Sequence, residues 1–156
     1  MDQRTLDDLI KALREKGQEW KTVDAKRELI LQEEGDKAEF AKDISAMANN
    51  GEPSYLVIGL ADKTFVDVGT LKYHYQKNDI NQILSKRIDP PVVVDYREFE
   101  ISNNGYALIE IIGDNPPYII GHDQIASKAD RKQVRIYKGT IFVRHEDRTE
   151  GISRSE

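Results

Sequence analysis

The segment that most constrains the fold is SYLVIGLA, residues 54–61, which carries no charged side chain. A strand that is apolar on both faces is typical of the centre of a sheet covered on both sides. Asn49-Asn50-Gly51 precede it and can adopt the left-handed backbone angles that end a helix. Asp62 follows directly. The sequence therefore predicts a helix, a turn and a buried central strand that ends in a carboxylate.

Three segments have apolar residues at the spacing of amphipathic helices, and each has start and stop signals. Capping residues favour the start of a helix, whereas glycine and proline favour its end. The start signals are Thr5 with Asp8, Asp36 with Glu39, and Asn78; the stop signals are Gly17, Asn49-Asn50-Gly51 and Pro90-Pro91. Three helices are therefore expected.

Strand patterns occupy most of the remaining chain. In residues 22–31, Val23 and Ala25 alternate with Asp24 and Lys26, which predicts a strand with one polar face. Two apolar patterns flank Ser102-Asn103-Asn104-Gly105, a strong hairpin signal. Towards the C-terminus the patterns predict a short strand at 117–121, a polar loop at 123–132, and a final hairpin of 133–137 with 140–144 around Lys138-Gly139.

These elements predict a single α+β (mixed α/β) domain. It would have a central mixed sheet, about three helices and C-terminal antiparallel hairpins. The chain of 156 residues, with 38% apolar and 33% charged residues, is long enough for one core. We expect residues 1–18 to form an N-terminal helix, residues 19–150 the main domain, and residues 151–156 a frayed tail.

Composition narrows the location and the partners. The chain has no cysteine, which fits a reducing cytoplasm, and its apolar runs are too short to cross a bilayer. We therefore expect a cytoplasmic protein without a membrane partner. The net charge of −5 argues against a uniformly basic nucleic-acid binder. Residues 128–156, however, hold 8 Lys and Arg against 5 Asp and Glu, so this segment is locally basic.

The final predicted hairpin combines cations with aromatic rings. A two-residue turn at Lys138-Gly139 would place four side chains on one outer face: Arg135, Tyr137, Phe142 and Arg144. Such a face suits phosphate contact and base stacking. Lys128, Arg131 and Lys132 lie nearby in the sequence and complete a candidate nucleic-acid-binding set. The alternative is an ordinary solvated face whose aromatic rings contact another element.

Carboxylates form a second candidate site. Asp24 and Lys26 share a strand face, Glu19 lies just upstream, and Asp62 ends the buried strand. Carboxylates at strand ends could hold Mg²⁺ or Mn²⁺, and Lys26 could then face a scissile phosphate. Glu19, Asp24 and Asp62 would be the metal ligands, and all four residues would be catalytic. The alternative is a set of ordinary surface ion pairs.

The order of these motifs resembles the Schlafen-type Alba-like domain family. In that family a Glu is followed, after four residues, by Glu-Phe-Lys; here Glu19 is followed by Asp24-Ala25-Lys26. The family helix ending and buried strand resemble residues 45–49 and 55–60 with Asp62, and its late motif resembles residues 139–144 with Thr149. The similarity covers roughly residues 19–150. Asp24 stands where the family has Glu.

The resemblance implies two functions. Bacterial relatives are regarded as DNA-binding domains of regulators, commonly followed by a further domain, whereas vertebrate Schlafen relatives are metal-dependent ribonucleases acting on structured RNA. We expect first a non-catalytic DNA- or RNA-binding domain of a prokaryotic transcriptional regulator or defence protein, which needs no cofactor. A Schlafen-like endoribonuclease using Mg²⁺ or Mn²⁺ is the second hypothesis, and a protein–protein interaction module is the third.

The apolar stripe of the N-terminal helix has two interpretations. It could pack on a second copy of the chain and form a homodimer, or it could cover the sheet of its own chain. We favour the second. For the nucleic-acid hypotheses, we expect the final ribbon and the acid-bearing strand ends to border one trough.

Overall fold

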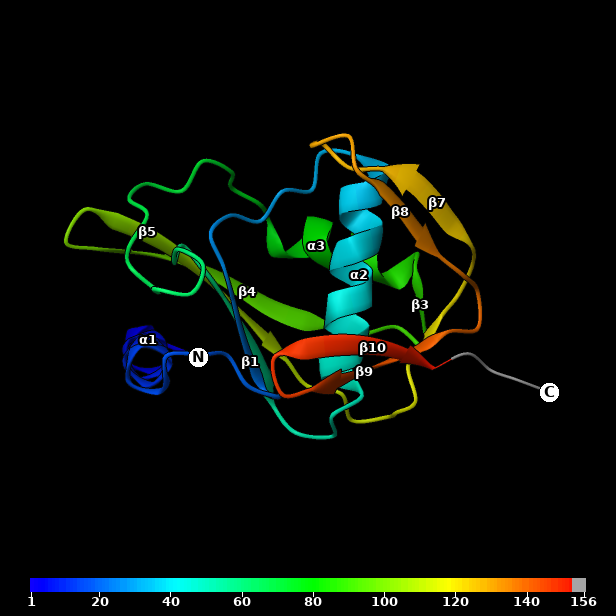
Figure 1. Ribbon diagram of the computed structural model, residues 1–156, viewed down its shortest axis with the longest axis horizontal. Helices are drawn as coiled ribbons and strands as arrows, with labels where there is room; N and C mark the ends of the chain where they lie inside the picture. Colours follow the sequence, from blue (N-terminus) through cyan, green and yellow to red (C-terminus); the bar gives the residue numbers. More distant parts are fainter. Residues whose placement is uncertain (153–156) are drawn as a thin grey trace.

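The computed structural model describes residues 1–152, whose helices and strands are shown in Figure 1. No helix of these residues combines the length and the apolar character needed to cross a membrane. The elements are α1 (Gln3–Lys16), β1 (Val23–Lys26), α2 (Glu34–Ala48), β2 (Ser54–Ile58), α3 (Lys77–Ser85), β3 (Ile88–Asp89), β4 (Val94–Ile101), β5 (Asn104–Ile111), β6 (Ile119–Ile120), β7 (Gln124–Ser127), β8 (Gln133–Ile136), β9 (Ile141–His145) and β10 (Arg148–Ile152).

The main sheet has the strand order β1-β2-β5-β4. β1 runs parallel to β2, whereas β5 is antiparallel to both of its neighbours, so the sheet is mixed. In β2, Leu56 and Val57 point to opposite faces and both are fully buried. The predicted covered central strand is therefore confirmed, as is the α+β fold class.

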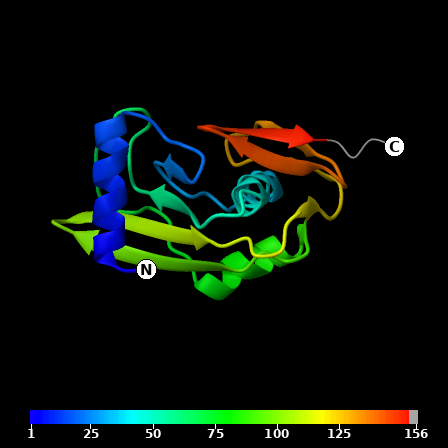
Figure 2. The same ribbon diagram turned by 90° about the horizontal axis from the view of Figure 1, so that it is seen from below.

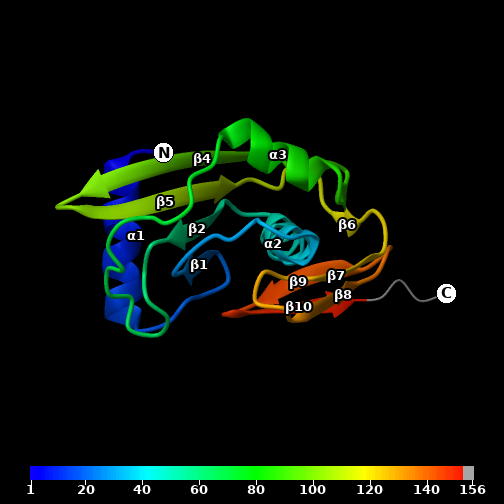
Figure 3. The same ribbon diagram turned by 90° about the horizontal axis from the view of Figure 1, so that it is seen from above.

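Helices cover both faces of this sheet (Figures 2 and 3). On one face, Leu6 and Leu13 of α1 belong to the same apolar cluster as Val57 and Leu108. On the other face, α2 and α3 join the cluster that contains Leu56. The stripe of α1 thus covers its own sheet, which was the favoured interpretation.

The central helix α2 is buried on two sides. One side faces the main sheet, and the other faces the ribbons β7–β8 and β9–β10, which lie beyond it in Figure 2. Ala38 and Ala46 form a small-residue surface against Ile136 and Phe142. The sequence pattern indicated only one apolar stripe, because alanines at close helix–strand contacts do not stand out in such a pattern.

Several helix ends differ from the predictions. α2 begins at Glu34, with Glu33 as the N-cap, and Asp36 accepts the Glu33 N–H at 3.0 Å in a capping box. α1 is capped by Asp2 rather than by Thr5 with Asp8, and it ends at Gly17 as predicted. α3 begins after Gln76, so Asn78 is not its cap, and it ends well before the prolines because residues 88–89 form β3 with β6.

The final hairpin is paired differently from the prediction. β8 pairs with β7, which lies inside the predicted polar loop, and β9 pairs with β10. The turn itself forms, since the Thr140 N–H donates to the Tyr137 carbonyl at 3.2 Å. The strands then diverge because residues 139 and 140 bond instead to Ile120. Gly151 and Ile152 belong to β10 rather than to a frayed tail, and residues 153–156 lie outside the described residues.

Candidate nucleic-acid interface

The outer face of the β7–β8 ribbon is exposed and basic. Ile125 lies opposite Arg135 in the strand register, and both are exposed, as are Tyr137 and the turn residues Arg131 and Lys132. The side chain of Ile136, between Arg135 and Tyr137, is buried against α2. This alternation keeps Arg135 and Tyr137 on one outer face, as the sequence predicted.

The cations of this ribbon differ in their partners. Within residues 1–152, no ion pair involves Arg131, Lys132 or Arg135. Lys128 instead places its Nζ 2.6 Å from Oε2 of Glu39, and this hydrogen bond raises the pKa of the ammonium group. Three cations are therefore available for an external anion, whereas Lys128 is held by the protein.

Phe142 and Arg144 do not lie on that outer face. Both are buried, with exposed fractions of 9% and 5%, because β9 pairs with β10 and turns these side chains towards α2 and β1. Phe142 packs in the cluster on α2. The predicted four-residue face required a β8–β9 hairpin, which the chain does not form. Only Arg135 and Tyr137 of that set remain exposed together.

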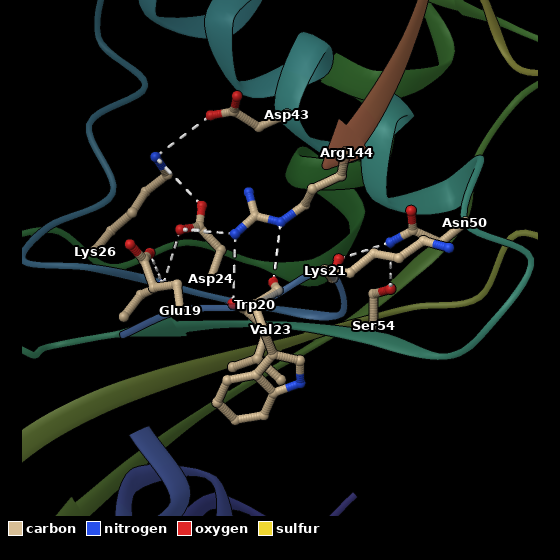
Figure 4. A network of polar contacts seen from close by, with 11 residues as sticks. Glu19, Trp20, Lys21, Val23, Asp24, Lys26, Asp43, Asn50, Ser54 and Arg144 are labelled. Carbon is tan, nitrogen blue, oxygen red and sulfur yellow. Dashed lines mark hydrogen bonds and ion pairs between the residues drawn. The ribbon is translucent and has the colours of Figure 1, made fainter. Parts of the chain in front are cut away.

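Arg144 ties β9 to the start of β1 (Figure 4). Its Nε donates to the Trp20 carbonyl at 3.2 Å, and its Nη2 donates to the Val23 carbonyl at 3.4 Å. The same Nη2 lies 3.6 Å from Oδ1 of Asp24. Because the Arg144 guanidinium is buried and has three partners within the protein, it stabilises the fold and does not face solvent.

Glu19 and Asp24 form a close carboxyl pair beside this arginine (Figure 4). The Ala25 N–H donates to Glu19 Oε2 at 2.7 Å and to Asp24 Oδ1 at 3.0 Å. Burial and a hydrogen bond between the two carboxyl groups raise the pKa of Glu19 to about 8. At neutral pH Glu19 therefore holds a proton, which reduces the negative charge beside Arg144 and the strength of Glu19 as a cation ligand.

Lys26 occupies the next position on the same face of β1. Its Nζ lies 3.3 Å from Asp43 on α2 and 3.9 Å from Asp24. Burial disfavours the charged form of Lys26, but the carboxylates of Asp43 and Asp24 outweigh that effect and raise its pKa. The ammonium group therefore stays charged and is neutralised internally.

Lys26 and Asp62 both line a cleft of about 410 Å³. The cleft lies between the end of β1, α2 and the β7–β8 turn. It is not the predicted trough between the final ribbon and the acid-bearing strand ends, because none of residues 133–144 lines it. Its walls are mainly acidic: the carboxylates are Glu28, Asp36, Glu39, Asp43, Asp62 and Asp130, and the cations are Lys26, Arg27 and Lys128. Glu19 and Asp24 are not among its lining residues.

The predicted metal ligands are not assembled. In the part of the chain that the structure describes, no three His, Cys, Asp or Glu residues are grouped so that they could hold a metal ion. Asp62 faces the cleft, whereas Glu19 and Asp24 contact each other and Arg144. Glu19, Asp24 and Asp62 thus do not fit an Mg²⁺ or Mn²⁺ site as arranged.

Two structurally important asparagines follow α2. The Asn49 amide donates to the carbonyls of Phe142 and Tyr118 at 2.9 and 3.0 Å, and its Oδ1 accepts the Tyr118 N–H at 2.7 Å. Asn50 donates to the Lys21 carbonyl at 2.8 Å (Figure 4). The sequence pattern indicated only a helix stop here. The only sequence feature that pointed to a further role was the family motif, which includes Asn49.

The chain belongs to the Schlafen, AlbA_2 family, whose model matches residues 19–153. This confirms the resemblance, and the family suggests a nucleic-acid-related domain. No curated protein matches the sequence. Among solved structures, the chain is similar to the DIP2311 protein from Corynebacterium diphtheriae, with 17% identity and a TM-score of 0.55. The match covers 85% of this chain but 22% of that one, and it shows a shared fold.

Proposed function

We propose that this chain is a non-catalytic nucleic-acid-binding domain of a prokaryotic transcriptional regulator or defence protein. The outer face of the β7–β8 ribbon would contact the phosphate backbone of DNA or RNA. The observation that carries the proposal is the exposed set of Arg131, Lys132 and Arg135, which have no ion pair within residues 1–152. Exposed Arg and Lys side chains without an internal partner are the usual donors to phosphate.

The neighbouring acidic cleft restricts where a polynucleotide can lie. Its carboxylates repel phosphate, and Lys26 and Lys128 are already neutralised by Asp43 and Glu39. The outer ribbon face is therefore the favoured contact surface. Because the net charge is −5, attraction at long range is weak and the contact is local.

The proposal is tested by titrating labelled DNA and RNA with the protein at two salt concentrations. Each phosphate contact contributes about −0.7 to −0.9 to the log–log slope of affinity against salt. We expect Lys132→Ala with Arg135→Ala to weaken binding and to make this slope shallower by about 1 to 2. Arg131 is left in place because its backbone is already in the left-handed region, with φ at 71°, and the double variant leaves this strained position of the turn unchanged.

Arg4→Ala with Lys11→Ala is the matched control. It removes the same charge from exposed positions of α1, which lies at the opposite end of the molecule from the ribbons (Figure 2). Affinity should change little in this variant. Equal losses in both variants, or no binding at low salt, would contradict the proposal; the latter result would favour the protein–protein interaction module.

The endoribonuclease hypothesis receives less support from the geometry. A metal ion would need Glu19, Asp24 and Asp62 together, and they do not form one donor set. We therefore assign no reaction step to these residues or to Lys26, and the proposed binding surface needs no metal. Cleavage of transfer RNA with Mn²⁺ or Mg²⁺ that Asp62→Asn abolishes would favour the nuclease instead.

A further inference from the structure

We propose that the β7–β8 face selects single-stranded over double-stranded nucleic acid and that Tyr137 stacks on a base. This inference rests on the proposed function and specifies the class of polynucleotide. The face carries both cations and exposed apolar groups: Tyr137 and Ile125 are 50% and 52% exposed. These two apolar surfaces do not contribute to phosphate binding, whereas an unpaired base offers a planar apolar surface that can stack on them.

The ribbon is fixed flat against α2. Its inner face is buried through Ile136, and its turn is held by Asp36, whose carboxylate accepts the Ala129 N–H at 3.1 Å. Gly35 adds a close contact, since a Cβ at this position would lie 2.5 Å from the Ser127 carbonyl group. A two-stranded ribbon reads duplex DNA by entering the major groove. This ribbon does not project from the body of the protein, so it cannot enter a groove in that way.

The charge around the turn also disfavours a duplex. Asp130 lies in the turn, and Glu39 lies beneath it beside Lys128. A duplex seated on the ribbon would bring its second phosphate strand towards these carboxylates and the acidic cleft. A single strand needs only one path for phosphates, along Lys132 and Arg135, and avoids this repulsion.

The backbone on either side of the Tyr137 ring is held by hydrogen bonds. Its carbonyl accepts the Thr140 N–H at 3.2 Å, and the following Lys138 N–H donates to Oδ1 of Asp123 at 2.8 Å. Both bonds fix the backbone at the end of β8 while the ring stays half-exposed. Because the backbone of Tyr137 is already ordered, stacking a base on its ring costs no backbone entropy at this position.

The test compares single strands with a duplex, using the full chain. Labelled oligothymidine and oligouridine of about 15 nucleotides and a duplex of the same length are titrated at one low salt concentration. We expect tighter binding of the single strands. Tyr137→Ala should weaken their binding by about 5- to 150-fold, the range that the stacking of one base provides, and Tyr137→Phe should retain it because the ring remains.

A 2-aminopurine base in the single strand supplies a direct readout of stacking. Its fluorescence should be quenched by the unmodified chain and by Tyr137→Phe but not by Tyr137→Ala, at saturating protein. If the duplex binds as tightly as the single strands and Tyr137→Ala has no effect, the inference is wrong while the proposed function stands. If neither binds at low salt, both are wrong.

Discussion

The guanidinium of Arg144 lies 3.6 Å from the carboxylate of Asp24 and joins β9 to β1 at a buried position. The same side chain donates to the Val23 carbonyl at the start of β1 and to the Trp20 carbonyl just before it. An arginine that the sequence places in a binding motif thus serves as a connection between the C-terminal ribbon and the main sheet.

Loss of this arginine should destabilise the domain. Arg144→Met keeps much of the apolar volume but leaves Asp24 and two carbonyls without their buried partner, which costs about 3–5 kcal/mol of unfolding free energy. Urea denaturation measures the loss. Arg148→Met is the control, because this arginine is 74% exposed on β10 and should change stability by less than about 1 kcal/mol. Equal unfolding midpoints for the two variants would contradict the structural role of Arg144.

The local parts of the fold are predictable from sequence, as the central strand shows. Residues 54–58 lack charges, so burial on both faces follows directly, and Gly17 ends α1 in the left-handed conformation that glycine favours. Asn49 ends α2 in a right-handed conformation, not in the left-handed one that was expected. The partner of β9 is not predictable in this way. Ile120, distant in sequence, bonds to the turn at residues 139 and 140 and separates β8 from β9.

In the candidate site too, features set by local sequence are predictable and features set by distant contacts are not. The alternation in β8 correctly separates Ile136 from Arg135 and Tyr137, because one strand has only two faces. Side chains also alternate between two faces in β9, but the elements that pack against this strand decide which face is buried. Phe142 is buried against α2 and Arg144 beside β1, so the face that carries them points into the protein. No spacing along the chain reveals that Glu19 meets Asp24 without Asp62.

Stability should depend on pH through Glu19. Its pKa is raised from 4.5 to about 8 in the folded chain, so the folded state binds a proton that the unfolded state releases between these values. The contribution of this group to stability is therefore present at low pH and is lost as the pH rises from about 4.5 to about 8. Urea midpoints at pH 5 and 8 should fall further in the unmodified chain than in Glu19→Gln. A parallel pH dependence in both proteins would contradict the raised pKa.

Asn49 should be critical for the docking of the C-terminal segments on α2. Asn49→Ala removes three hydrogen bonds and leaves groups of Tyr118 and Phe142 unpaired, at a cost of about 1–3 kcal/mol. Asn78→Ala tests the same substitution at an exposed position of α3 without a capping bond and should be nearly neutral. Thermal unfolding of the two variants makes the comparison, and similar melting temperatures would mean that the Asn49 contacts contribute nothing.

Asp36 should hold the ribbon turn through one carboxylate. Asp36→Ala removes the acceptor for the N–H groups of Glu33 and Ala129, so it weakens the start of α2 and releases the turn together. We expect the free energy of unfolding to fall by about 1–2 kcal/mol. Hydrogen exchange should become faster at Ala129 and its neighbours but not in the main sheet. Asp79→Ala, in the first turn of α3, is the control because Asp79 lies outside this contact. If exchange at residues 127–132 is unchanged in Asp36→Ala, the turn is held by other contacts, and the flat ribbon would then depend on the close packing of Gly35.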